Sequence, residues 1–318
     1  MKIIRIVAAL ILTLILLRIA KETSRGHPEH LVRTVNGFTF DMMTVPKGPE
    51  KSNARIEATI KGGPGTDFEP VLLYTERGIN TPPMQYEQVP MLPVDSVPML
   101  YYANVPTGER GGRLHYMIDL MKDDIMEARL AQADGKPFEL RYIGDVPKVV
   151  LIGHIGLMFA TVFCVIMAAL HALSLVRGGG NVIPMERFFF WSFVFALVGG
   201  YPFGFGMNWF AFHSIWEGVP FGTDATDNKT QLLVAYLLLM TVANLGTLTR
   251  GKLGKDIWSP KTSGYFGVAA FVLMLVIYLI PHSIQFSAVS MYLVCYGFIA
   301  LAALIYLIGI RRARGSTT

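Results

Sequence analysis

The sequence predicts an α+β membrane protein: an N-terminal membrane anchor, an external β-sandwich and a C-terminal five-helix transmembrane bundle. The chain has 318 residues, of which 52% are hydrophobic and only 16% are charged, against about 25% charged in an average soluble domain. The charge is also uneven. Residues 21–148 carry 15 Lys/Arg and 18 Asp/Glu, whereas residues 149–318 carry 10 and 5. One soluble domain followed by one membrane domain explains both observations.

Residues 1–20 begin with basic side chains and continue as an apolar segment. Lys2 and Arg5 precede the run 6–17, which is apolar apart from one threonine, and Arg18 follows. A signal-peptide core and a short membrane anchor both have this length. Arg18 and its neighbours make a poor cleavage site, so we favour an uncleaved anchor whose N-terminus stays inside.

Residues 21–148 contain seven β-rich runs that are separated by turn signals rich in glycine and proline. The runs cover residues 37–43, 54–62, 70–76, 84–89, 100–105, 113–120 and 138–143. Short strands at such spacing predict a β-sandwich. One short helix is expected at 123–133, between the last two strands.

Several of these runs carry a resemblance to a known class of modules. The segments are RIEATI at 55–60, VLLY at 71–74, VPM at 89–91, YANVP at 102–106 and LHYMI at 114–118. Together they make residues 35–145, about a third of the chain, resemble immunoglobulin-like or fibronectin-III-like sandwiches. The resemblance implies a fold and a contact surface, and it brings no catalytic residues. The antibody-type cysteine pair is absent, so the core alone must stabilise the domain.

The membrane domain, residues 149–318, contains five apolar stretches. They cover residues 149–176, 188–212, 232–249, 264–280 and 288–310. At 1.5 Å per residue each can cross a hydrocarbon core of about 30 Å, and the anchor makes six spans.

The orientation of these spans follows from the positive-inside rule. The predicted inner segments hold 11 Lys/Arg and 2 Asp/Glu, and they cover residues 1–5, 177–187, 250–261 and 311–318. The outer links 213–231 and 281–287 hold one lysine and three acids. We therefore expect a bacterial cytoplasmic membrane, with both termini in the cytoplasm and the sandwich outside.

The second apolar stretch is a broken helix, 199–212, because glycine and proline crowd residues 199–206. Such breaks need protein or water to satisfy the backbone, and in transporters they often line binding sites. The ligand-binding candidates on and after the break are Asn208, Trp209, Trp216, Glu217, Asp224 and Asp227. The alternative is a proline-kinked helix and a loop in which Thr226 or Asp227 caps the next helix.

Three histidines lie toward the predicted outer ends of the spans: His154, His213 and His282. They are candidates for binding one b-type haem or a metal. His154 is the strongest of them, because imidazole is costly within lipid unless it has a role. A copper hypothesis rests on the histidines and methionines of the sandwich: His27, His30 and His115 with eight methionines between Met42 and Met126.

Other chemistry has little support. The sequence contains no Gly-x-Ser-x-Gly, phosphate-loop or His-Glu-x-x-His motif, so no catalytic residue is assigned. No span has an acid or lysine at its middle, which argues against an ion-coupled pump. The basic excess lies beside apolar segments, so the expected partner is the lipid bilayer and not nucleic acid.

Three functions remain. The first is a non-enzymatic subunit or accessory protein whose sandwich binds a protein partner on the outer face. The second is a redox protein with a single haem or metal near that face. The third is a transporter or small-ligand binder that uses the broken helix. We rank them in this order.

Overall fold

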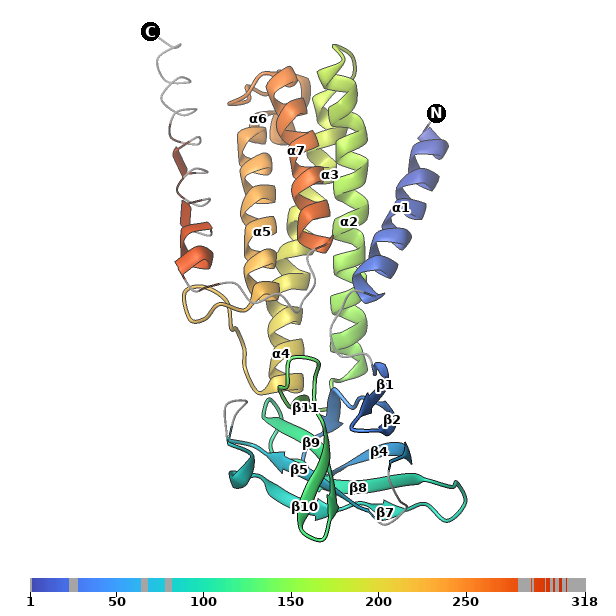
Figure 1. The fold of residues 1–318 in the computed structure, drawn as a ribbon. Coiled ribbons are helices and arrows are strands. Elements are labelled where there is room, and N and C mark those ends of the chain that lie inside the picture. Colours follow the sequence, from blue (N-terminus) through green and yellow to red (C-terminus); the bar gives the residue numbers. More distant parts are fainter. Residues whose placement is uncertain are drawn as a thin grey trace. The chain divides into compact units, whose positions relative to one another are not determined.

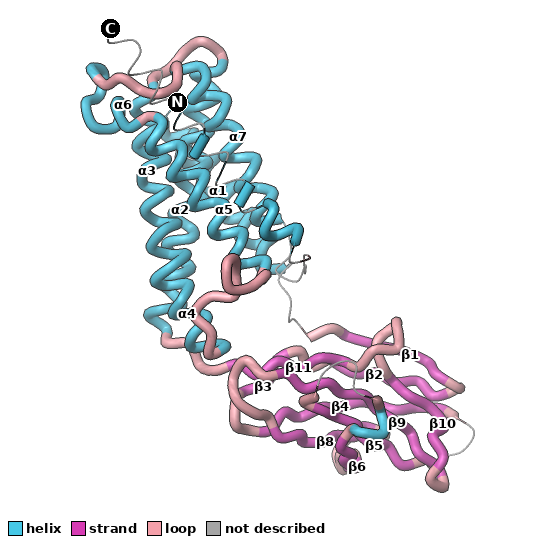
Figure 2. Tube along the Cα trace, turned by 90° about the vertical axis from the view of Figure 1, so that its left-hand side faces the viewer, coloured by secondary structure: helices cyan, strands magenta, loops and turns pink. Residues whose placement is uncertain are grey.

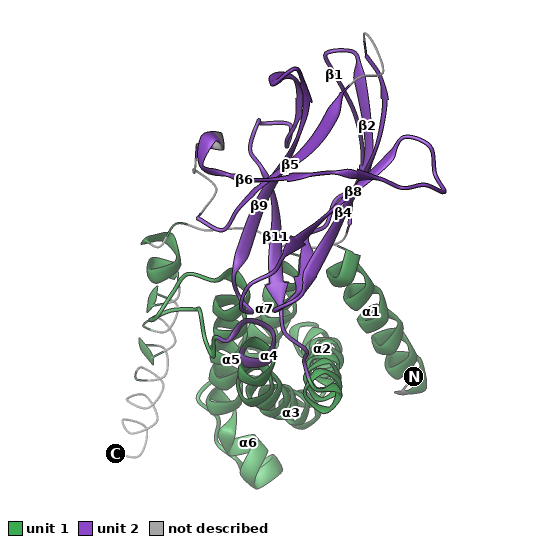
Figure 3. Cartoon of the chain, turned by 90° about the horizontal axis from the view of Figure 1, so that it is seen from below, with its two compact units in different colours: residues 1–25, 147–208, 214–318 green, residues 26–146, 209–213 purple. Residues whose placement is uncertain are grey.

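The computed structural model describes residues 2–22, 28–63, 68–77 and 82–279, and in the remaining part residues 287, 289–294, 296, 297, 300, 303, 304 and 307. The chain divides into two compact units, coloured separately in Figure 3. The helical unit contains residues 1–25, 147–208 and 214–318. The sandwich unit contains residues 26–146 and 209–213.

The sandwich unit is built from two sheets. Sheet A has the order β1-β2-β4-β8-β7, and its strands are β1 (His30–Val35), β2 (Phe38–Met43), β4 (Asn53–Gly62), β8 (Leu100–Pro106) and β7 (Leu92–Pro93). Sheet B has the order β3-β11-β9-β5-β6, and its strands are β3 (Lys47–Pro49), β11 (Phe138–Ile143), β9 (Arg113–Lys122), β5 (Glu69–Thr75) and β6 (Glu87–Pro90). A further strand, β10 (Ile125–Leu130), pairs with β9 (Figure 1).

The core lies between the inner faces of these sheets, because the strands alternate between buried and exposed side chains. In β4, Ala54, Ile56, Ala58 and Ile60 are buried, and the residues between them point outward. The largest fully buried side chains from sheet B include Tyr116 of β9, whose hydroxyl accepts a hydrogen bond from the Val45 amide at 3.1 Å. The domain is therefore a β-sandwich with one continuous apolar core.

Two expectations about this unit are wrong. The segment 123–133 is not a helix, because β10 folds back on β9 with Ile125 opposite Lys122. Asp123 and Asp124 form the turn with positive φ angles of 47° and 64°, the conformation that a two-residue hairpin requires. The run 84–89 is not one strand either, since a 3₁₀ turn, η1 (Pro83–Gln85), precedes β6.

The helical unit contains six α-helices and most of a seventh, α4, within residues 2–279. They are α1 (Lys2–Glu22), α2 (Lys148–Val176), α3 (Val182–Val198), α4 (Gly204–Phe212), α5 (Ala225–Ala243), α6 (Leu245–Arg250) and α7 (Pro260–Leu279). A π-helical turn, η2 (Gly199–Phe203), joins α3 to α4, and a 3₁₀ turn, η3 (Gly251–Leu253), follows α6. The last residues of α4, from Trp209, belong to the sandwich unit. Figure 2 shows the long helices α1, α2, α3, α5 and α7 running alongside one another.

Four helices of the described chain are long and apolar enough to cross a membrane: Ile3–Glu22, Lys148–Val176, Val182–Phe212 and Pro260–Leu279. This number differs from the six predicted spans. The stretch 232–249 is not one helix, because α5 ends at Ala243 and Asn244 separates it from α6. The Asn244 side chain donates to the Met240 carbonyl at 3.0 Å and accepts from the Ser263 hydroxyl at 2.6 Å. Most of the stretch 288–310 lies outside the described residues.

Candidate functional site

The helix is not interrupted at the predicted break: α3, η2 and α4 form one continuous helix, Val182–Phe212, with a π-helical turn at Gly199–Phe203. Pro202 lies within η2, where it cannot donate an amide hydrogen bond. The His154 ring of α2 donates from Nδ1 to the Gly199 carbonyl at 2.9 Å. Gly200 is needed for close packing, since a Cβ there would lie 2.4 Å from the Thr230 side chain.

Three of the predicted ligand-binding residues meet at one carboxylate. Asp227, in the first turn of α5, accepts hydrogen bonds from the Glu217 amide at 2.6 Å and from Asn208 Nδ2 at 3.2 Å. Burial raises the pKa of Asp227 to about 6, although these two hydrogen bonds favour its charged form. The contacts fasten the loop after α4 to the start of α5.

The other two candidates of the helical unit also have partners in this loop. Asp224 caps α5, because its Oδ1 accepts from the amides of Thr226 at 2.8 Å and Asp227 at 3.0 Å. The expectation that Thr226 or Asp227 is the cap is therefore wrong. Trp216 stacks on Tyr201 at 5.5 Å between ring centroids and donates from Nε1 to a loop carbonyl. These interactions fit a fastened loop, and a ligand site here stays a prediction.

The last two candidates, Trp209 and His213, belong to the sandwich unit. Their rings meet edge to face at 4.6 Å, and His213 has a positive φ of 60°. Within this unit the segment 209–213 is held by three contacts: Arg110 Nη1 donating to the Phe210 carbonyl at 3.3 Å, the Gly144 amide donating to the Ala211 carbonyl at 3.1 Å, and the Arg141 guanidinium 3.7 Å from the Phe212 ring centroid. The aromatic residues here are thus part of the fold.

The proposed haem or metal ligands are not shown together. His154 lies in the helical unit, His213 lies in the sandwich unit, and His282 lies outside the described residues. Within the part of the chain that the structure describes, no three His, Cys, Asp or Glu side chains form a group able to hold a metal ion. The histidines of the copper hypothesis are not brought together either. Strand pairing places His30 on the outer face of sheet A and His115 on that of sheet B, and His27 is not described.

The outer face of sheet A contains a groove of about 570 Å³ that the sequence analysis missed. It is lined by His30, Asp41, Met42, Met43, Val45, Arg55, Glu57, Thr59 and Leu100. Three apolar side chains on the strands of this sheet are half exposed: Val32 at 56%, Met43 at 50% and Leu92 at 54%. Val32 lies opposite Asp41 in the strand register, so it belongs to the same face.

The polar groups of this face form one pair between β1 and β2 and one along β4. His30 Nε2 lies 2.7 Å from Asp41 Oδ1, and Arg55 Nε donates to Glu57 Oε1 at 2.5 Å. The Arg55 guanidinium also lies 4.0 Å from the centroid of the Tyr102 ring. Small-molecule sites are usually concave and enclose their ligand. An open, mixed apolar and polar surface with an Arg–Tyr pair is typical of a protein interface.

Part of the outer face of sheet B is covered instead. Leu73, Tyr86, Met117 and Ala131 form a second buried apolar cluster there. Next to it, Asp119 accepts a bidentate pair of hydrogen bonds from Arg129, at 2.7 Å and 2.6 Å.

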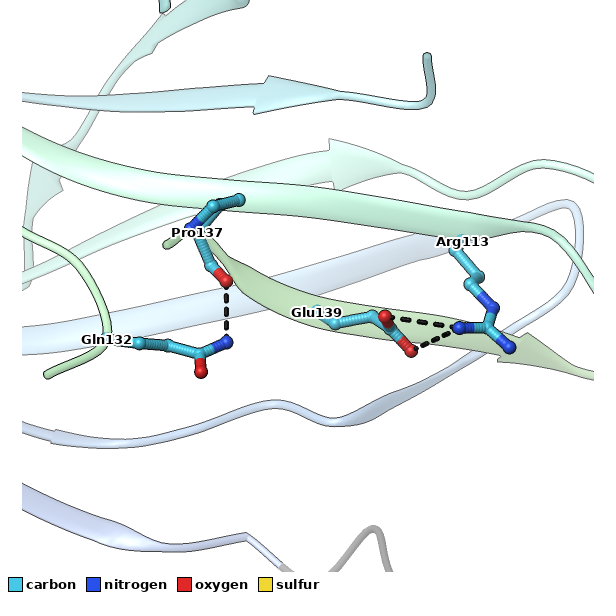
Figure 4. Close-up of polar contacts among 4 residues, drawn as sticks. All are labelled: Arg113, Gln132, Pro137 and Glu139. Carbon is cyan, nitrogen blue, oxygen red and sulfur yellow. Dashed lines mark hydrogen bonds and ion pairs between the residues drawn. The ribbon is translucent and has the colours of Figure 1, made fainter. Parts of the chain in front are cut away.

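The rim of this covered face is also fixed by polar contacts (Figure 4). Arg113 Nη1 donates to both oxygens of Glu139, at 3.1 Å and 3.3 Å, and so ties β9 to β11. The Gln132 side chain donates to the Pro137 carbonyl at 2.6 Å and fastens the turn before β11. The buried cluster and these contacts therefore occupy part of the outer face of sheet B.

A signal for the open face was present in the sequence. In β2 and β4 the residues alternate between apolar and polar. The polar ones, Asp41, Arg55, Glu57 and Thr59, could therefore be assigned to one outer face. What the sequence could not show is that sheet B has a cover and sheet A has none among the described residues.

Sequence comparison adds no family to this structure: no protein-family model matches the chain, and no curated protein matches it.

Proposed function

We propose that this chain is a multi-pass membrane protein acting as a non-enzymatic subunit or accessory protein, and that its sandwich binds a protein partner through the groove on sheet A. One observation carries the proposal. Val32, Met43 and Leu92 are half exposed on this face, whereas Leu73, Tyr86, Met117 and Ala131 of the other outer face form a buried cluster. Exposed apolar residues gathered on one face commonly mark an interaction site.

The chemistry of the groove supports a protein chain as the occupant. Apolar burial contributes about 25 cal/mol for each Å² removed from water, so half-exposed aliphatic side chains gain from being covered. Arginine and tyrosine are among the residues that most often dominate the binding energy of protein interfaces. On this face the Arg55 guanidinium packs over the Tyr102 ring. The pairs His30–Asp41 and Arg55–Glu57 would set orientation and specificity more than affinity.

The setting of this function follows from the charge pattern of the sequence. Positive charge concentrates in the predicted inner segments, which supports a sandwich outside a bacterial cytoplasmic membrane and cytoplasmic termini. An immunoglobulin-like or fibronectin-III-like module is the sandwich type that we propose, and such modules commonly serve as contact domains. The partner would then be an external protein or the external part of another membrane protein.

The proposal is tested with two matched double variants of the full-length protein. Val32→Glu with Met43→Glu places charge on the groove face. Ile125→Glu with Met126→Glu places the same charge on the hairpin of β10, where both side chains are also exposed. Each tagged variant is purified from native membranes in mild detergent, and co-purified proteins are quantified by mass spectrometry.

The groove variant should lose a partner that the wild type and the hairpin variant both retain. Losing central apolar contacts costs about 2 kcal/mol, which corresponds to about thirty-fold weaker binding. Equal recovery of the same proteins with both variants would contradict the proposal. Thermal unfolding of the two variants shows whether both remain folded.

A second candidate, one haem or metal held by His154, is favoured by the orientation of this ring. Nδ1 donates to the Gly199 carbonyl, so in the neutral ring Nε2 carries the lone pair that a metal needs. The test is the visible spectrum of the purified protein, oxidised and reduced, with metal analysis of the same sample. A Soret band that is lost in His154→Ala supports this function, and a colourless, metal-free protein counts against it.

A further inference from the structure

The helical unit contains one buried acid that has no hydrogen-bond partner in the described chain. Glu186 lies in the second turn of α3 and is fully buried. Neither carboxyl oxygen accepts a hydrogen bond or forms an ion pair with any described residue. The sequence placed Glu186 in the inner link 177–187, but α3 begins at Val182, and Asn181 caps it through a hydrogen bond to the Ile183 amide at 2.9 Å.

Asp227, in the same unit, is a buried carboxylate that does have hydrogen-bond donors. It is also buried, yet its oxygens accept hydrogen bonds from the Glu217 amide and the Asn208 side chain. Those donors replace part of the hydration that an ionised carboxylate loses. Glu186 has no such replacement among the described residues, so its ionised form would be far more costly than that of Asp227.

Among the described residues, no basic side chain forms an ion pair with Glu186, and one other acid lies near it. The charge of Asp256, in the loop after η3, acts on Glu186. Asp256 itself accepts hydrogen bonds from the Thr247 amide at 2.6 Å and from the Thr247 hydroxyl. A second acid near Glu186 makes the ionised form of Glu186 less favourable still.

The other titratable groups near this end of the bundle do not neutralise Glu186. From α2, the His171 ring stacks on Phe188 of α3, at 6.0 Å between centroids. The basic side chains from the end of α2 to the start of α3 and from α6 to the start of α7 are exposed: Arg177, Arg187, Arg250, Lys252, Lys255 and Lys261. Burying an unpaired carboxylate costs several kcal/mol, so the group is expected to be neutral instead.

We propose that Glu186 is a proton-binding site of the helical unit. The carboxyl group holds a proton in this conformation and releases it only when α3 shifts enough to admit water or a basic group. This inference is independent of partner binding by the sandwich. It gives the membrane part of the chain a chemistry of its own, uptake and release of a proton at the end where α3 begins.

The experiment uses the full-length protein in lipid nanodiscs and dicyclohexylcarbodiimide, an apolar reagent that adds to protonated carboxyl groups. The acid O–H adds across one C=N bond of the reagent, and the acyl group then moves to nitrogen, so no other reactant is needed. Peptide mapping by mass spectrometry identifies the labelled residue. We expect label on Glu186, no label at that position in Glu186→Gln, and no label on Asp227 near neutral pH.

Infrared spectroscopy provides a second readout that does not depend on reagent access. The wild-type spectrum should contain the carbonyl stretch of a protonated carboxylic acid, and Glu186→Gln should lose that band while keeping the amide bands of the folded protein. A wild-type spectrum without this band overturns the proposal. Labelling of Glu186 that appears only after sodium, calcium or magnesium is removed also overturns it, because the site would then bind a metal ion.

Discussion

The two outer faces of the sandwich belong to one fold, yet one is open and the other is covered. Sheet A presents the groove and the half-exposed Val32 and Met43. Sheet B buries Met117 in a cluster with Tyr86 and Ala131. An apolar side chain outside the central core therefore stabilises the fold where other residues cover it, and is available for binding where none do. Each face also carries one Asp and one His, so matched variants can test the difference.

The largest expected difference concerns the two aspartates. Asp119→Ala should destabilise the sandwich by about 3 kcal/mol, because it leaves Arg129 unpaired beside a buried cluster. Asp41→Ala should cost less than about 1 kcal/mol, since the Asp41–His30 pair is exposed. Urea unfolding of the full-length protein in detergent, read by proteolysis of sandwich peptides, measures both. Similar costs for the two variants would remove the distinction between the faces.

The two methionines give the next largest difference. Met117→Ala removes a side chain that is 3% exposed, and it should cost about 2–3 kcal/mol through lost burial and a cavity. Met43→Ala removes one that is 50% exposed, and it should change stability by less than about 0.5 kcal/mol. The same unfolding assay applies, and a larger cost for Met43→Ala would show that sheet A has a cover.

A smaller effect is expected from His115, on the covered face. Burial lowers the pKa of His115, and its Nδ1 has no partner among the described residues. The unfolded chain therefore binds a proton more readily than the folded one below about pH 6.5, and stability should fall on acidification through that range. One proton gives at most about 1.4 kcal/mol per pH unit. His115→Gln should flatten the dependence measured between pH 7 and 5, and an unchanged slope would assign it to other groups.

Much of the fold was predictable because the apolar residues follow regular patterns along the sequence. Alternation identified β4 and β2, and long apolar runs identified α2 and α7. These patterns gave a wrong prediction where contacts with another strand determine the secondary structure. The segment 125–130 pairs with β9, although its own sequence suits a helix.

The candidate sites were harder to predict, for physical reasons that particular residues show. Glycine and proline marked the π-helical turn η2, but only the structure shows that Asn208 and Glu217 bind Asp227. Glu186 was assigned to a link because it is charged. The Asn181 cap, with its side chain on the Ile183 amide, was the local signal that α3 begins earlier.

The most direct test of partner binding through sheet A is site-specific photocrosslinking in native membranes. A photoreactive amino acid replaces Glu57 on sheet A in one variant and Glu139 on sheet B in the other, and each change breaks one ion pair on its face. The account predicts that position 57 crosslinks to the protein that the groove variant loses, and that position 139 does not. Crosslinks from position 139 alone, or none from position 57, would contradict it.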